Sequence, residues 1–292
     1  MNRIKGILYA AVSSSTFGLA PFFSITLLLA GFSAFEVLSY RWGVASIVLI
    51  VFGWLSGCNF RLAGKDWGVV FLLSLLRAVT SFSLIIAYQN IASGVASTIH
   101  FMYPLAVALV MMFFFREKKS LLVILAVLMS LLGAALLSLG ELEAKSGNTM
   151  VGLVAACVSV FSYAGYIVGV RTTRAVQINS TVLTCYVMGL GTIFYLIGAY
   201  CTSGLQLVSD GYTWLIILGL ALPATAISNI TLVQAIKYAG PTLTSILGAM
   251  EPLTAVVIGV FVFKELFTVN SAVGIILILL AVSIVVFRRQ KS

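Results

Sequence analysis

The chain has 292 residues, of which 61% are hydrophobic and only 9% are charged. Soluble domains carry roughly 25% charged residues, so this composition excludes a water-soluble globular fold. The formal net charge of +9 comes with no basic face or motif, which argues against nucleic acid as a partner. We therefore expect an integral membrane protein whose surroundings are the lipid bilayer.

Segments of about 20 apolar residues cross a bilayer as helices, because lipid offers no partner for unpaired backbone groups. The alternating pattern of a membrane β-barrel is missing, so the predicted fold class is all-α. Breaks at Gly, Pro, Ser, Asn and charged residues predict ten transmembrane helices. In chain order they cover residues 6–29, 33–56, 67–90, 94–115, 120–139, 149–170, 179–203, 212–236, 240–263 and 269–287.

The ten predicted helices divide into two similar sets of five. Residues 102–105 (MYPL) lead to the pair Arg116-Glu117, and about 148 residues later residues 250–253 (MEPL) lead to Lys264-Glu265. The polar stretch 140–148 separates the two sets, which predicts a first repeat over residues 1–140 and a second over residues 149–292. Because five is an odd number, the second repeat must cross the membrane in the opposite sense, which makes the repeats inverted.

The positions of Lys and Arg predict the orientation, because these residues concentrate in cytoplasmic loops. If the N-terminus is cytoplasmic, most of the 17 basic residues fall on the cytoplasmic side, and only Lys145 and Lys264 fall in outer loops. The pattern therefore predicts that both termini are cytoplasmic, and it suits a multi-pass protein of the cell inner membrane.

Residues 39–42 (SYRW), residues 87–93 (AYQNIAS) and the two proline-containing segments resemble the EamA-type transporters of the drug/metabolite transporter superfamily. The resemblance covers both halves of the chain. It implies a carrier with ten helices in two inverted repeats, and a central cavity lined largely by the third, fourth, eighth and ninth helices. The substrates of the family range over amino acids, other metabolites, drugs and, in distant branches, nucleotide sugars.

Ionisable residues inside a membrane are costly, so they are the first candidates for a site. Four qualify: Arg41, Arg77, His100 and Glu251. At 1.5 Å per residue, Glu251 and Arg77 both lie roughly 15–16 Å deep. Glu251 is a candidate to face a substrate or cation, with Arg77 as its counter-ion or as the partner of a substrate carboxylate. The alternative is a fixed structural ion pair between the two.

His100 is the only histidine, and it titrates near working pH, which makes it a candidate to carry a coupling proton. A single interhelical hydrogen bond is the alternative. Arg41 lies near the outer face, where its long side chain is expected to reach the headgroups in a structural role.

Further polar residues could widen a pocket around these charges. Pro104 and Pro252 are expected to kink their helices and leave backbone carbonyls free for a cavity. The other candidates, by helical spacing or position, are Ser97, Tyr103, Thr244, Tyr88, Ser81, Asn229 and Gln234, with Tyr163 and Tyr166 in the sixth helix. For the aromatic residues, helix packing or anchoring at the membrane interface is the alternative.

The leading functional prediction is a secondary transporter, acting as an exporter of small organic molecules such as amino acids or related metabolites. It would work by alternating access around a midplane cavity, with protons as a candidate coupling ion and without a cofactor or metal. A membrane-embedded enzyme would need a cluster of carboxylates or His/Ser groups at one membrane surface, and the sequence shows none. A channel is a third alternative, although paired kinked helices and inverted repeats favour alternation.

Overall fold

The structure is a computed structural model that describes residues 2–91, 93–117, 121–138, 147–202, 204–261 and 269–288. Lys145, the pair Lys264-Glu265 and most of the polar stretch between the predicted repeats lie outside these residues. The regular secondary structure of the described residues is helical, with short 3₁₀ turns and a π-helical segment, and loops such as 58–63 and 204–210 connect the helices. The predicted all-α class is therefore confirmed.

In chain order the elements are α1 (Asn2–Phe17), α2 (Ala20–Leu29), α3 (Ala34–Leu55), η1 (Gly64–Asp66), α4 (Trp67–Asn90), α5 (Ser93–His100), α6 (Tyr103–Phe113), α7 (Leu121–Ser138), α8 (Thr149–Thr172), η3 (Arg174–Gln177), α9 (Ser180–Thr202), α10 (Gly211–Ala221), η4 (Leu222–Ile227), α11 (Ser228–Ala239), α12 (Pro241–Leu247), α13 (Met250–Phe261) and α14 (Val269–Arg288).

Seven of the described helical segments are long and apolar enough to cross a membrane. Two shorter apolar helices accompany them, Leu121–Gly133 within α7 and Ala272–Ile284 within α14. Large apolar side chains such as Leu29, Trp54 and Phe114 point away from the bundle and are exposed. Such a surface is stable in lipid and not in water, so the chain is a multi-pass membrane protein.

Three apolar stretches are built from two helices each, separated by a short non-helical turn. They are α1 with α2, α5 with α6, and α12 with α13. A proline stands within the first three positions of each second helix, namely Pro21, Pro104 and Pro252. Proline has no N–H to donate and its ring clashes with the preceding turn, which favours an interruption at these places.

A fourth apolar stretch changes its winding without stopping. Between α10 and α11 the six residues of η4 form a π-helix that begins at Leu222 and contains Pro223. Thr225 Oγ1 donates a hydrogen bond to the Leu220 carbonyl, at 2.7 Å. A π turn holds more residues than an α turn and leaves backbone groups available to side chains of neighbouring helices.

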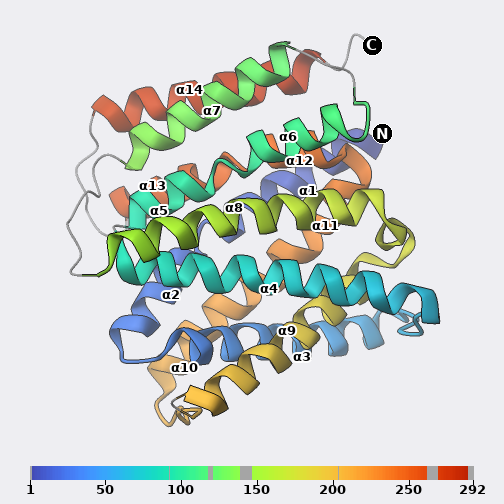
Figure 1. Cartoon of the computed structure of the whole chain (residues 1–292), viewed down its shortest axis with the longest axis vertical. Helices are drawn as coiled ribbons and strands as arrows, with labels where there is room; N and C mark the ends of the chain where they lie inside the picture. The colour runs from blue at the N-terminus through green and yellow to red at the C-terminus, as the bar shows by residue number, and fades with distance from the viewer. Residues whose placement is uncertain are drawn as a thin grey trace.

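The two halves of the chain interlock, and their contacts follow a two-fold pattern. α4 packs along α8, and the helices at the equivalent positions of the opposite halves, α11 and α1, pack along each other. α3 packs against α9, and α7 against α14, so that each pair joins equivalent helices (Figure 1). Exchanging the halves leaves this pattern unchanged, as expected for two repeats of one unit.

Equivalent helices run in opposite directions. Gly6, near the start of α1, lies against Ala239 at the end of α11, whereas Gly152, near the start of α8, lies against Ile91 just after α4. Figure 1 shows that α1 begins and α14 ends at one end of the bundle, whereas α8 begins at the other.

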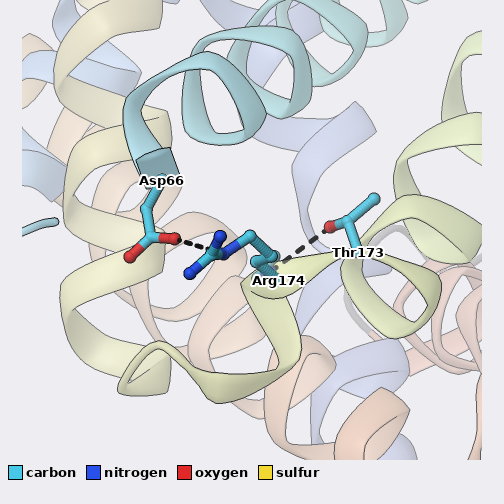
Figure 2. A network of polar contacts seen from close by, with 4 residues as sticks. Asp66, Thr173 and Arg174 are labelled. Carbon is cyan, nitrogen blue, oxygen red and sulfur yellow. Dashed lines mark hydrogen bonds and ion pairs between the residues drawn. The ribbon is translucent and has the colours of Figure 1, made fainter. Parts of the chain in front are cut away.

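Charged residues gather at the end of the bundle where α4 begins. Arg174 Nε forms an ion pair with Asp66 Oδ1 at 3.1 Å (Figure 2). Arg171 Nη1 donates to the Lys237 carbonyl at 3.1 Å. Exposed ion pairs contribute little stability, typically below about 1 kcal/mol, so these contacts mainly fix how the loop after α8 meets α4 and α11.

Candidate functional site

Arg77 lies on α4 and is only 1% exposed. Its Nε donates to Oδ1 of Asn229 on α11 at 3.1 Å, and its Nη1 donates to Oγ of Ser81 at 3.5 Å. Asn229 in turn donates Nδ2 to the Thr225 carbonyl at 2.7 Å. Since α4 and α11 belong to different halves, Arg77, Ser81 and Asn229 meet where the halves join.

Three aromatic rings surround the Arg77 guanidinium. Its Cζ lies 5.3 Å from the ring centroid of Phe17, 4.9 Å from that of Tyr163 and 5.9 Å from that of Tyr166. Such cation–π contacts contribute up to about 2 kcal/mol each when desolvated, which offsets part of the cost of burying the cation. These contacts do not neutralise the positive charge of the Arg77 guanidinium.

His100 joins the same aromatic group from α5. Its ring stacks on Tyr163 with centroids 5.4 Å apart, and the Tyr103 ring lies 5.5 Å away. His100 Nδ1 shares a hydrogen bond of 2.8 Å with Oγ of Ser159 on α8.

A second hydrogen bond of Ser159 indicates which nitrogen of the neutral His100 ring carries the proton. The Ser159 hydroxyl donates its only proton to the Ala156 carbonyl, at 2.6 Å, so it can only accept from His100. The hydrogen-bond network therefore places the ring proton on Nδ1. Nε2 then carries a lone pair that is buried and has no hydrogen-bond partner among the described residues.

Glu251 approaches from α13, beside the turn between α1 and α2. A Cβ on Gly18 would lie 2.6 Å from the Glu251 carbonyl oxygen, so glycine permits the close approach of the two chains. The Glu251 carboxylate interacts electrostatically with both Arg77 and Arg41. Within the described residues, however, no cation lies within 4.0 Å of it and no side chain donates a hydrogen bond to it. The direct ion pair with Arg77 is not formed in this conformation.

The expectation that Arg41 reaches the lipid headgroups is wrong. Arg41 is 5% exposed, and its Nε donates to Thr225 Oγ1 at 2.7 Å. Its Nη2 reaches the Ala224 carbonyl at 3.5 Å, and its Cζ lies 5.5 Å from the ring centroid of Phe17. The π turn of η4 offers a hydroxyl and a carbonyl inside the bundle, and these hold the guanidinium in the interior.

A small pocket opens between Arg41 and Arg77. It is lined by α1, α2, α3 and α4, and its polar wall includes Ser81 and Tyr88. The cavity volume is about 10 Å³, which is close to the space that one water molecule requires. The residues that line the pocket differ from the prediction, because the first and second apolar stretches contribute to the pocket wall as well as the third.

The remaining predicted residues lie at different distances from this centre. Tyr88 and Ser97 contact each other, with 3.2 Å between their hydroxyl oxygens. Thr244 uses its hydroxyl within its own helix, on the Gly240 carbonyl at 2.8 Å. Gln234 is half-buried and forms no side-chain hydrogen bond within the described part of the chain.

The broken stretches that contain Pro104 and Pro252 meet beside the site. Gly248, in the turn before α13, faces Tyr103 at the start of α6, and a Cβ on Gly248 would lie 1.8 Å from the Tyr103 hydroxyl oxygen. The tyrosine therefore occupies the space that a larger residue at 248 would need.

Sequence reasoning missed the partners that define the site. Phe17, Ser159 and Thr225 are neutral and common in membrane helices, so no charge or spacing marked them. Pro223, which lies in η4, was the available signal for Thr225, because proline favours local irregularity in a transmembrane helix.

Two interlocked repeats of apolar helices around a buried polar centre define a membrane-transporter fold. The model of the EamA-like transporter family matches residues 4–139 and again residues 150–287. The chain belongs to this family, and the predicted resemblance is confirmed. The double match also shows a two-repeat architecture.

A solved structure titled "Crystal structure of protein" is similar to the chain with a TM-score of 0.81 and 18% sequence identity. The match covers 100% of this chain and 99% of that chain. At this identity the likeness shows the fold alone. Among curated proteins, none matches the chain.

Proposed function

We propose that the chain is a secondary transporter that exports small organic molecules such as amino acids or related metabolites. The observation that carries this proposal is the contact of Arg77 on α4 with Asn229 on α11, which places a buried cation where the two halves join. A carrier needs its site between units that can move against each other, so that binding energy differs between the two states. Membership of the EamA-like transporter family supports the same function.

The proposed topology has ten membrane-spanning segments in two inverted repeats, residues 1–140 and 149–292. α1 with α2, α5 with α6, α10 with α11, and α12 with α13 each count as one crossing. Both termini are proposed to be cytoplasmic, in the cell inner membrane. Two observations support this: α1 begins and α14 ends at the same end of the bundle, and the basic residues Arg171, Arg174 and Lys237 lie together at one end.

Within the site we assign Arg77 and Glu251 to the substrate and His100 to a coupling proton. Arg77 is buried, Glu251 is half-buried and of opposite charge, and no direct ion pair joins them in this conformation. His100 offers the lone pair of Nε2 inside the bundle. Protonation there would add a further cation close to Arg77, which gives a physical means of coupling a proton to substrate affinity.

Transport by the purified protein in liposomes tests this proposal. Vesicles loaded with one amino acid at a time and given the same labelled amino acid outside should show saturable counterflow for at least one of them. Glu251→Gln should abolish counterflow, His100→Ala should change its pH dependence, and Asp210→Asn serves as a matched acid-to-amide control outside the centre. If both site variants transport at the wild-type rate and pH dependence, the assignment is wrong. Flux without counterflow would indicate a channel, and formation of a product would indicate an enzyme.

A further inference from the structure

We propose that Arg41 and Arg77 form a carboxylate clamp across Phe17, which binds the carboxylate of the transported molecule. This rests on the proposed transport function and names the chemical group that the site recognises.

The two guanidinium groups face one ring and one pocket. Their Cζ atoms lie 5.5 Å and 5.3 Å from the Phe17 centroid, so they are at most about 11 Å apart, the sum of these distances. Both side chains line the same cavity. The same bundle region therefore holds two like charges, which repel each other and gain from an anion placed between them.

Among the described residues, no carboxylate lies within ion-pair distance of either arginine. In the described part of the chain the ion pair within 4.0 Å joins Arg174 and Asp66, far from this pocket. Arg41 and Arg77 bind neutral oxygen atoms instead, on Thr225, Ala224, Asn229 and Ser81. These bonds satisfy part of the donors and fix the orientation of both planar groups, but they place no counter-ion in direct contact with either charge. A buried charge without a counter-ion is costly, and a ligand carboxylate would remove that cost.

Donor groups remain for such a ligand. A guanidinium has five N–H donors. Arg77 uses its Nε and Nη1, and its Nη2 has no acceptor among the described residues; the same holds for Nη1 of Arg41. Planar guanidinium groups match the planar carboxylate with two parallel hydrogen bonds.

The charges nearby favour a monoanion. Both arginines act electrostatically on Glu251, and when its carboxylate is ionised, two cations and one carboxylate leave one positive charge in excess. A monocarboxylate neutralises this excess, whereas a phosphate dianion would exceed it. Because the cavity is about the size of one water molecule, the pocket must open to admit the molecule, its carboxylate included.

Binding to the full-length protein in detergent tests the clamp. The probes are the L-amino acids, each compared with its carboxamide, and lactate, benzoate and inorganic phosphate. Thermal unfolding and calorimetry give the affinity. At least one carboxylate should bind, and its amide should bind about 10- to 100-fold more weakly, the loss expected for a charge-assisted bidentate contact.

Substitutions then identify the partner of the carboxylate. Arg77→Gln and, separately, Arg41→Gln should weaken binding of the acid by about 10- to 100-fold and leave binding of the amide unchanged. Arg77→Lys and Arg41→Lys keep the charge without the planar fork, and should retain part of the affinity if the glutamine variants do not fold. Arg61→Gln, an exposed arginine, is the matched control and should bind like the wild type.

The outcomes separate the clamp from the proposed function. If lactate or benzoate binds in an arginine-dependent way and no amino acid does, the clamp holds and the assignment to amino acids fails. If an acid and its amide bind equally, or if phosphate binds in their place, the clamp is overturned while transport can still be measured. If folded Arg41→Gln and Arg77→Gln proteins bind the acid like the wild type, both arginines have structural roles only and the clamp is wrong.

Discussion

The Glu117 carboxylate accepts a hydrogen bond of 2.5 Å from the Thr242 hydroxyl, and this contact joins the segment after α6 to the first turn of α12. The two residues belong to different halves of the chain. A hydrogen bond to a charged group contributes about 1.5–3 kcal/mol, so this contact holds the halves together at one end of the bundle.

We expect Glu117→Gln to loosen that end. The amide replaces a charged acceptor with a weaker neutral one, and the population of conformations open at this end should rise about 10-fold, the equivalent of roughly 1.4 kcal/mol. The measurement is the rate of thiol labelling of a cysteine at Ser245, which is buried here, in a protein without its four native cysteines. Thr242→Val should have the same effect, and the double variant should add little. Unchanged labelling of both folded variants would contradict this role.

Asn229→Asp should convert the neutral acceptor of Arg77 into a fixed counter-ion. The carboxylate would replace the amide oxygen, which lies 3.1 Å from Arg77 Nε. The substitution also removes the donor to the Thr225 carbonyl, so the melting temperature is not the readout. Counterflow should fall at least about 10-fold, because the cation is no longer available to a ligand. Asn229→Ala is the matched variant and should lower stability by about 1–3 kcal/mol. Wild-type counterflow by Asn229→Asp would exclude Arg77 from substrate binding.

Gly248→Ala should destabilise the protein. The added methyl group would lie 1.8 Å from the Tyr103 hydroxyl oxygen and 2.7 Å from the Ser245 carbonyl oxygen, so the backbone and Tyr103 must both move. Overpacking of this kind costs typically about 1–3 kcal/mol. Tyr103→Phe removes one of the two obstacles and should rescue part of the loss, which a double-mutant cycle of melting temperatures measures. Additive effects would show that the two residues do not share this space.

Asp210 should make the start of α10 sensitive to acid. Its carboxylate accepts a hydrogen bond from the Thr213 backbone N–H at 2.7 Å, and this bond lowers the pKa of Asp210 below its ordinary value of 3.8. Because the folded pKa lies below the unfolded one, the stabilisation is present above about pH 4 and is lost as the pH falls through the folded pKa. Hydrogen exchange of the Thr213 amide should therefore be more protected at pH 6 than at pH 3, beyond the intrinsic pH effect. Asp210→Asn keeps an acceptor without the charge and should remove this difference.

Many of the transmembrane helices could be predicted, because a lipid bilayer requires the segments that cross it to be apolar helices. The third predicted helix covers 67–90 and α4 covers Trp67–Asn90; the sixth begins at 149, as α8 does. Clear local signals mark these ends, such as Asn148, whose side chain caps α8. Interruptions inside a helix were harder to place. The first apolar stretch continues through Pro21 in the sequence, yet α1 ends at Phe17.

The charged residues of the site could be predicted from the sequence, whereas the residues that contact them could not. Apolar surroundings make Arg77, His100 and Glu251 stand out, and their depth follows from helix geometry. Depth does not define which way a side chain points around the helix axis, because that depends on how several helices pack. Arg41 shows the difference: its position near one end of α3 predicted a turn toward the headgroups, whereas Thr225 of another helix holds it inside.

The wide turn of η4 has a mechanical consequence. A π-helical turn accommodates one residue more than α geometry allows, so tightening it would rotate everything C-terminal to it by about 100°, the angle of one residue in an α-helix. Such a rotation would carry Asn229, which follows η4, off Arg77 and release that guanidinium group. Deleting Ala226 would impose the tightened winding permanently. Spin-label distances between α4 and α11 that match the wild type in that deletion variant would show that η4 is a rigid element and not a pivot.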